Sequence, residues 1–355
     1  MSRQQPEPLA CLIASRNMGD IVMWTGLLRE LVAAGYARRY VVWTRPKMAC
    51  MFEAIADCDI VCSSFPVGTG NRFGPRELAG LLKAAAQIRA RRPSVVLDFV
   101  GDFRERAFAR LIGGRHLQIG WAAGHGHSRV IRNPLGPGRP FVTVPVEVPN
   151  IYDGYRLMLD ALIPLERRQS GAAAAGVRRR GPIRRIGLHP FASRPSKLWP
   201  EECWRELAQA LLARGFDLCA FASPEERPAC ERMFSGLTDR LVVHHTDVRK
   251  YSLEVSQLDL LIGLESLSMH MAHLWGVPSI TINAGSPAEL YAVPTGQTLA
   301  DTGGCPHYPC FNVAPCRGTS SENACVKAIS PQRVLAALEA LQRRSQQAPA
   351  QSLAG

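Results

Sequence analysis

The sequence predicts an α/β protein with two similar domains, each a parallel sheet covered by helices. Its 355 residues are enough for two domains at roughly 150 residues each. Short apolar runs rich in β-forming residues alternate with longer helical patterns, and this alternation occurs once in each half of the chain. Between the halves lies a stretch without apolar periodicity, which indicates a linker.

In the first half, helical patterns are expected at residues 21–34, 76–91 and 104–112. The first of them spaces Leu27, Leu28 and Leu31 for one buried face and ends at Gly35, a residue suited to the left-handed conformation of a helix C-cap. The apolar runs predict strands at residues 9–14, 40–44, 60–62, 95–99 and 117–121.

The second half repeats this order. Its first helix is expected to open at Pro200, with Glu201 and Glu202 at the positive end of the helix dipole, and to close at Gly215. The apolar runs predict strands at residues 185–188, 217–221, 241–243, 258–262 and 279–282.

The expected domains are residues 1–165 and 183–342, joined by a basic linker at 166–182 and followed by a disordered tail at 343–355. The net charge is +12, and half of it lies in and beside the linker. Residues 166–185 contain one acidic residue, Glu166, and seven arginines: Arg167, Arg168, Arg178, Arg179, Arg180, Arg184 and Arg185. Such a cluster is expected to attract an anionic membrane surface or a phosphorylated acceptor.

Composition excludes several classes of protein. Hydrophobic residues make up 46% and charged residues 20%, which disfavours a disordered or fibrous chain. No apolar run has the roughly 18 residues of a membrane span, and the run at 9–14 is too short for a signal sequence, so a cytoplasmic protein is expected. The basic charge comes without a nucleic-acid-binding motif and with few aromatic residues, so no nucleic-acid partner is predicted.

Polar residues that follow strands are the candidates for ligand binding, because ligands bind at the carboxyl ends of parallel strands. After the first strand come Arg16, Asn17, Gly19 and Asp20. The carboxylate of Asp20 is suited to accept a proton from a sugar hydroxyl, although spacing alone favours a cap of the helix that follows.

In the second half, the loop after the first strand contains Ser193, Arg194 and Lys197. A hydroxyl, two cations and a helix N-terminus are the groups that a pyrophosphate needs, although a solvated basic loop has the same composition. Neither GxGxxG nor a P-loop is present, which disfavours ordinary dinucleotide and ATPase sites.

Two further loops carry polar residues. Glu225 and Glu226 follow Ser223-Pro224, where a carboxylate is placed either to accept ribose hydroxyls or to form an ordinary capped helix start. The other loop holds Glu265, Ser266 and Ser268 at a helix start, where they are suited to bind a sugar or phosphate, followed by His270, a residue type that is often buried and satisfied.

The order and spacing of these stretches resemble glycosyltransferase family 9, the heptosyltransferase family of lipopolysaccharide core assembly, over about residues 8–335. The resemblance rests on Met18-Gly19-Asp20-Ile21-Val22 with Leu27-Leu28; on 95–98 with Arg104 and 119–121; on 188–190 with Lys197 and 199–200; on 223–226; and on 262–272 leading into 276–278. No single stretch is diagnostic by itself.

The resemblance implies a GT-B fold, with two Rossmann-like domains that face an interdomain cleft. It implies inverting, metal-independent transfer without a required cofactor, from a nucleotide-diphosphate sugar such as ADP-heptose to a lipid-linked glycan at the inner membrane face. Asp20 matches the base, and Arg16, Asn17, Asp98 and Arg104 are expected acceptor contacts. Expected donor contacts are Ser193, Arg194 and Lys197 for the diphosphate, one of Glu225 or Glu226 for ribose, and Glu265, Ser266, Ser268 and His270.

Two positions depart from the family pattern. Glu265 and Leu267 stand where the family commonly has Asp and Gly, which leaves open a changed donor-sugar pocket, another donor or a protein acceptor, or a member that binds nucleotide sugar without transferring it.

Four of the eleven cysteines lie close together near the end of the chain: Cys305, Cys310, Cys316 and Cys325. Thiolates at this spacing, with His307 beside them, are potential ligands of a structural Zn²⁺ or iron, but the tight C-x2-C knuckle is missing. Reduced packing thiols and a disulfide are the alternatives. The resemblance makes this segment a family feature and does not choose among them, and a structural role is expected in each case.

Overall fold

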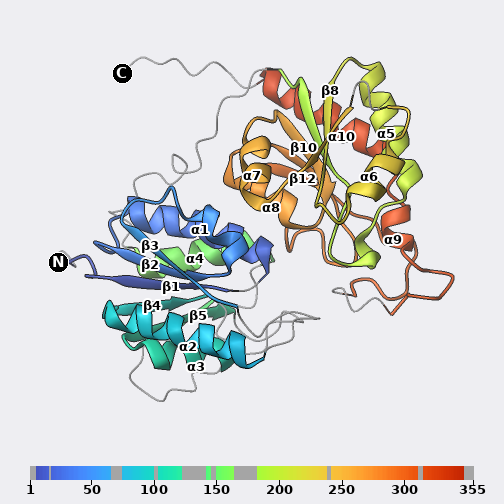
Figure 1. Cartoon of the computed structure of the whole chain (residues 1–355). Coiled ribbons are helices and arrows are strands. Elements are labelled where there is room, and N and C mark those ends of the chain that lie inside the picture. Colours follow the sequence, from blue (N-terminus) through green and yellow to red (C-terminus); the bar gives the residue numbers. More distant parts are fainter. Residues whose placement is uncertain are drawn as a thin grey trace, which may run out of the picture. The chain divides into compact units, whose positions relative to one another are not determined.

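The computed structural model describes residues 5–15, 17–64, 74–99, 103–121, 141–144, 149–163, 182–237, 241–310 and 315–347. The chain divides into two compact units, residues 1–176 and 177–355, which we describe separately (Figure 1). Most of the expected linker lies outside the described residues, so the domain boundaries at 165 and 183 stay predictions. None of the described helices combines the length and the apolar character that crossing a bilayer requires.

The N-terminal unit is built on one parallel sheet of six strands in the order β3-β2-β1-β4-β5-β6. The strands are β1 (Ala10–Ala14), β2 (Tyr40–Thr44), β3 (Cys58–Cys62), β4 (Val95–Asp98), β5 (Arg115–Trp121) and β6 (Phe141–Val144). Every residue of β1, β2 and β4 is buried, as expected for strands covered on both faces.

Helices cover both faces of this sheet, with α1 and α4 on one side and α2 and α3 on the other (Figure 1). Their bounds are α1 (Met18–Ala33), α2 (Pro75–Ala90), α3 (Phe103–Ile112) and α4 (Ile151–Leu162), with a short 3-10 helix η1 (Pro46–Met51). On the α2/α3 side, Trp43 of β2 stacks on Phe108 of α3 with ring centroids 3.5 Å apart. On the α1/α4 side, Trp24 Nε1 donates to Tyr155 Oη at 3.1 Å.

The C-terminal unit has the same topology, a six-stranded parallel sheet in the order β12-β11-β10-β7-β8-β9. Its strands are β7 (Arg185–His189), β8 (Asp217–Ala222), β9 (Leu241–His245), β10 (Leu260–Leu264), β11 (Ser279–Ile282) and β12 (Gly296–Leu299). Its helices are η4 (Pro195–Lys197), α5 (Glu201–Ala213), α6 (Arg227–Met233), α7 (Val248–Ser256), α8 (Leu267–Leu274), α9 (Ala324–Lys327) and α10 (Pro331–Gln347).

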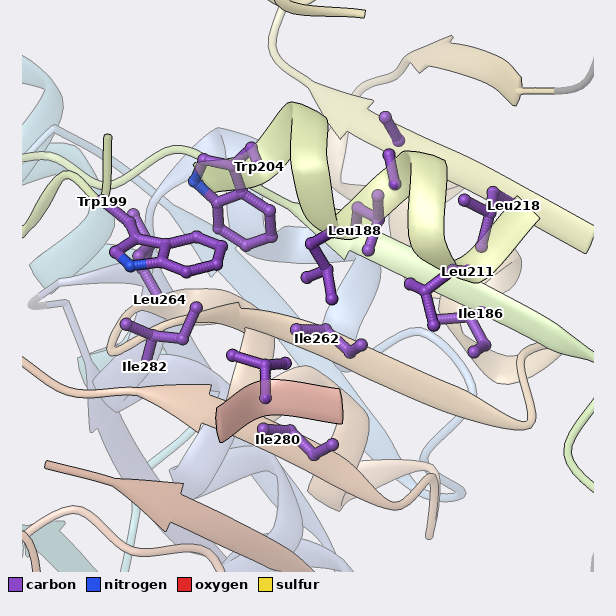
Figure 2. Packing of buried hydrophobic residues seen from close by; sticks show 14 of the residues in the cluster. Ile186, Leu188, Trp199, Trp204, Leu211, Leu218, Ile262, Leu264, Ile280 and Ile282 are labelled. Carbon is purple, nitrogen blue, oxygen red and sulfur yellow. The ribbon is translucent and has the colours of Figure 1, made fainter. Parts of the chain in front are cut away.

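An apolar cluster of this unit joins side chains of the sheet with those of helices α5, α6 and α10, and Figure 2 shows part of it. Trp204 of α5 is fully buried and meets Trp199 edge to face, with centroids 5.0 Å apart. Leu188 and Ile262, from adjacent strands, lie beneath these rings. Burial of such large side chains stabilises the unit and fixes the carboxyl end of β7, from which the Lys197 loop departs.

The fold class predicted from the sequence, two Rossmann-like parallel-sheet domains, is confirmed. Several details differ. Helix α1 begins at Met18 rather than at residue 21, and β6, α4 and β12 were not predicted. The expected tail at 343–355 begins as helix, because α10 continues to Gln347.

Candidate functional site

Both sheets place a topological switch point at their centre. In each unit the chain adds strands on one side of its first strand and then returns to add the others on the opposite side. The switch therefore lies between β1 and β4 in one unit and between β7 and β10 in the other. Loops diverge at the carboxyl ends of these strand pairs, which is where open α/β sheets bind ligands.

At the first switch point, Asp20 occupies the first turn of α1. Asn17, not Asp20, is the N-cap residue, so the interpretation of Asp20 as the cap is wrong. The Asn17 side chain donates to Asp20 Oδ2 at 3.1 Å, and the carboxylate is half-buried. A negative charge in the first turn is stabilised by the helix dipole, so the fold holds a carboxylate at this edge.

Buried polar contacts fix the turn that leads to Asp20. Arg45 Nε donates to the Ser15 carbonyl at 2.7 Å, and Ser15 Oγ lies 3.3 Å from Glu105 Oε1. Ser15 and Glu105 are 1% and 0% exposed. Glu105 was not singled out in the sequence, because a glutamate in an Arg-rich helix resembles an ordinary surface residue; only the fold turns it inward.

Asp98 is the last residue of β4 and so also lies at this switch point, but it is completely buried. Its Oδ2 lies 3.2 Å from Nε2 of His116, which is itself buried. This burial does not fit the expected direct contact of Asp98 with an acceptor, and it gives the residue a supporting position at the end of β4. Of the other expected acceptor contacts, Asn17 lies beside Asp20, whereas Arg16 and the Arg104 side chain lie outside the described residues.

At the second switch point, Lys197 and Glu265 form a buried ion pair. Lys197 ends η4 in the loop after β7, and Glu265 follows β10. Lys197 Nζ lies 2.6 Å from Glu265 Oε1 and 3.3 Å from the Glu265 carbonyl, and the side chains are 12% and 5% exposed. Ser193 and Arg194 are exposed on the same loop as Lys197. The structure thus brings together two residues that the sequence had placed in separate loops.

A second set of contacts holds the other oxygen of Glu265. Ser286 Oγ donates to Glu265 Oε2, and its Oγ also lies 3.1 Å from Asn283 Oδ1. The Ser286 carbonyl accepts from Asn283 Nδ2 at 2.7 Å and from Tyr308 Oη at 2.6 Å. Ser286, Asn283 and Tyr308 were not predicted from the sequence, because none of them belongs to a recognisable motif.

Helix α8 begins beside this pair. Ser266 is its N-cap residue, and the Ser266 and Ser268 hydroxyls lie 3.0 Å apart. Gly263 of β10 has no room for a side chain, because a Cβ there would lie 2.9 Å from Ser268 Oγ. His270 is buried, and burial, with smaller effects of His273 and Lys197, lowers its pKa to about 3. It is therefore a neutral ring at pH 7, and its burial agrees with the alternative interpretation of His270 as a partly buried histidine.

The loop after β8 forms a reciprocal cap. The Ser223 amide donates to Glu226 Oε2 at 2.9 Å, and the Glu226 amide donates to Ser223 Oγ at 3.3 Å. One oxygen of Glu226 is therefore used at the helix start, whereas Glu225 is exposed beside it.

The four late cysteines do not gather into a metal-ligand set. All four are free thiols, Cys316 and Cys325 are buried, and no disulfide joins them in the structure. In the part of the chain that the structure describes, no group of three or more His, Cys, Asp or Glu side chains is arranged to hold a metal ion. Burial raises the pKa of Cys325, with smaller contributions from Cys305 and Cys310, so this thiol stays protonated at neutral pH.

Solved structures share this architecture. A family 9 glycosyl transferase from Veillonella parvula aligns with a TM-score of 0.72 and 18% identity, over 97% of this chain and 100% of its own. The E. coli ADP-heptose lps heptosyltransferase II aligns with a TM-score of 0.67, 16% identity and coverages of 95% and 99%. E. coli heptosyltransferase WaaC, solved with ADP-2-deoxy-2-fluoro heptose, aligns with a TM-score of 0.67 and 14% identity, over 94% of this chain and 99% of its own.

Among curated proteins, none is similar enough in sequence to give a match. The model of glycosyltransferase family 9 (heptosyltransferase) matches residues 85–314, about two thirds of the chain. With the fold and these two switch points, that match shows that the chain belongs to glycosyltransferase family 9 and is a glycosyltransferase with a GT-B, heptosyltransferase-like fold.

Proposed function

We propose that this enzyme transfers heptose from ADP-heptose to a lipopolysaccharide core or related glycan, with inversion at the anomeric carbon and without a metal. One observation carries the proposal: each of two Rossmann-like sheets presents, at its switch point, one of the two groups that the reaction needs. Asp20 supplies a carboxylate in one unit, and Lys197 supplies a cation in the other.

In the proposed reaction, the acceptor hydroxyl gives its proton to Asp20 while its oxygen forms a bond to the anomeric carbon. The bond between that carbon and the diphosphate oxygen breaks on the opposite face, and the diphosphate leaves with the electron pair. A positioned base contributes about 10²- to 10⁴-fold to such a step. Lys197, Arg194 and backbone amides at the start of α5 and α8 are proposed to stabilise the departing charge.

The ion pair sets a condition on donor binding. Because Lys197 is already 2.6 Å from Glu265, a bound diphosphate must share this lysine with a carboxylate. The longer Glu265 side chain, where the family commonly has Asp, carries its carboxylate to Lys197. We propose that Glu265 tunes donor affinity in this way, that Glu225 is the ribose contact, and that Ser193, Ser266 and Ser268 complete the donor site.

A nucleotide-sugar screen by calorimetry tests the donor. We expect ADP-heptose to bind, in keeping with the ADP-sugar in the WaaC structure and in the heptosyltransferase II name. Exclusive binding of a UDP- or GDP-sugar would contradict the heptosyl assignment. Transfer that continues in excess chelator is the expected result for metal independence.

The same ion pair favours a second candidate function, a member that binds nucleotide sugar without transferring it. A carboxylate that neutralises Lys197 would disfavour the departing diphosphate. A donor that binds but is neither transferred nor hydrolysed with any glycan or protein acceptor would support this alternative.

We also propose that the enzyme works in the cytoplasm at an anionic membrane surface, where a lipid-linked acceptor resides. Two features of the chain support this proposal: the basic sequence 166–185, and the leucines that the N-terminal unit exposes among basic residues, Leu78 and Leu82 on α2 and Leu111 on α3. Among the described side chains of these helices, the exposed basic residues are Arg76, Lys83, Arg89 and Arg110. Exposed leucines among cations are typical of surfaces that bind anionic lipid.

Binding to vesicles with and without anionic lipid tests this contact. Neutralising Arg178, Arg179 and Arg180, or replacing Leu78 and Leu82 by Ser, is expected to weaken anionic-vesicle binding in low salt. Unchanged binding in both variants would contradict the membrane proposal and would leave the donor assignment intact.

A further inference from the structure

We infer that two residues of the Cys-rich part of the chain, Tyr308 and Asn323, are positioning residues of the donor site that fix the Lys197–Glu265 pair from both sides. The inference extends the proposed donor-binding role of this pair. It assigns a structural role to a part of the chain whose cysteines, among the described residues, form neither a metal site nor a disulfide.

On the Glu265 side, the connection runs through Tyr308. Its hydroxyl donates to the Ser286 carbonyl at 2.6 Å, and the Ser286 hydroxyl donates to Glu265 Oε2. Ser286 is completely buried, and its carbonyl also accepts from the side-chain amide of Asn283 at 2.7 Å. Tyr308 therefore fixes the backbone of the residue whose hydroxyl orients the Glu265 carboxylate.

On the Lys197 side, the connection runs through Asn323. Its Nδ2 donates to the Pro195 carbonyl at 3.4 Å, and Pro195 opens the single turn of η4 that ends at Lys197. Asn323 adopts a left-handed conformation with φ of 57°, which Asn tolerates better than most residues. Just beyond this turn, Trp199 Nε1 donates to the Ile329 carbonyl at 2.8 Å, which secures the same loop to the chain after α9.

Tyr308, and Cys325 two residues after Asn323, lie at the core of the C-terminal unit. Cys325 is buried within the apolar cluster beneath α5 and α10, and Tyr308 packs against that cluster. Burial raises the pKa of Tyr308, so its hydroxyl keeps the proton that it donates. With Tyr308 bonded on the Glu265 side and Asn323 on the Lys197 side, we expect these two residues to set the separation of the pair, and a buried charge pair is sensitive to small displacements.

The test is a double-mutant cycle that needs no substrate. The coupling between Lys197→Met and Glu265→Gln is measured by urea unfolding in the wild-type background and in the Tyr308→Phe and Asn323→Gly backgrounds. Glycine keeps the left-handed backbone of residue 323 while removing its amide. We expect the coupling to fall to half or less in both backgrounds.

Tyr251→Phe is the matched control, because the buried Tyr251 hydroxyl has no hydrogen-bond partner among the described residues, and it is expected to leave the coupling unchanged. Unchanged coupling in both the Tyr308→Phe and Asn323→Gly backgrounds would overturn the inference.

Donor kinetics separate this inference from the proposed function. Tyr308→Phe is expected to raise KM for the nucleotide sugar about threefold to tenfold with kcat nearly unchanged, because a displaced Lys197 weakens donor and transition state alike. A fall in coupling without any change in KM would support positioning of the pair and contradict its role in donor binding. If neither the coupling nor KM changes, the inference is contradicted. The proposed function is then tested separately, by the effect of Lys197 substitutions on donor affinity.

Discussion

The two units share one strand order but present different chemistry at their switch points. In the N-terminal unit, the β1–β4 switch carries Asp20 in the first turn of a helix, supported by buried Ser15 and Glu105. In the C-terminal unit, the β7–β10 switch carries the buried Lys197–Glu265 pair. The difference teaches that the shared topology supplies the location, whereas a few residues at the strand ends decide whether that location holds a carboxylate at a helix start or a buried ion pair.

The largest expected effect concerns Asp20. Replacing it by Asn keeps the shape and removes the base, so we expect kcat to fall about 10²- to 10⁴-fold. Asp153→Asn is the matched control, because Asp153 occupies the first turn of α4 in the same unit. Steady-state transfer assays of both variants make the measurement. Equal activity of Asp20→Asn and Asp153→Asn would remove Asp20 as the base.

The second prediction breaks the ion pair of the other unit. Lys197→Met leaves Glu265 as an unpaired buried carboxylate, which is expected to cost about 3–5 kcal/mol of unfolding free energy. The double variant Lys197→Met/Glu265→Gln removes both charges and is expected to recover most of that loss. Urea unfolding of both single variants and of the double variant measures this. A double variant as unstable as the sum of the two singles would show that the pair is not coupled.

The third prediction concerns pH. Burial lowers the pKa of His270 to about 3 and that of His273 to about 4, from an ordinary value of 6.5. Both rings are neutral in the folded protein, whereas the same groups in the unfolded chain take up protons below pH 6.5. Their contribution to the free energy of unfolding is therefore complete above pH 6.5 and is lost as the pH falls toward 4. Each group is expected to contribute a slope of up to about 1.4 kcal/mol per pH unit in that window.

Urea unfolding at pH 7, 6 and 5 measures this slope. His273→Gln, which keeps a polar partner for Thr295, is expected to flatten it. A wild type whose stability is constant between pH 7 and 5 would contradict the assignment.

The smallest expected effects separate the neighbouring residues Glu225 and Glu226. Glu226→Ala loses the reciprocal cap with Ser223 and is expected to cost about 0.5–2 kcal/mol of stability. Glu225→Ala is expected to change stability by less than about 0.5 kcal/mol and to weaken ADP binding. Thermal unfolding and calorimetry distinguish the two. The reverse pattern would move the ribose contact to Glu226.

Much of the fold was predictable from local patterns, whereas the contacts between residues of the candidate site were not. Strand β2 and strand β11 were predicted to the residue, because apolar β-branched runs between turn residues leave little ambiguity. Strand β12 was missed because only one residue of Gly-Gln-Thr-Leu is buried. The start of α1 was placed too late because Gly19 was interpreted as a turn, although Asn17 caps the helix before it.

The site residues divide in the same way. Asp20 and Lys197 follow strands and stand within motifs, so the sequence made them candidates, and their roles stay predictions. The contact of Lys197 with Glu265 joins residues 68 positions apart and exists only because β7 and β10 are neighbours in the sheet. Tyr308 and Ser286 were missed for the same reason, since a carbonyl and a hydroxyl carry no sequence signature.

The division of labour between the two units is tested most directly by ADP affinity in two variants. Calorimetry is expected to give an unchanged Kd, within about twofold, for Asp20→Asn. For Lys197→Met/Glu265→Gln, compared with Glu265→Gln alone, we expect ADP to bind about 10- to 100-fold more weakly, the value of a hydrogen bond to a charged group. An ADP affinity that falls in Asp20→Asn and is unchanged when Lys197 is lost would contradict the account.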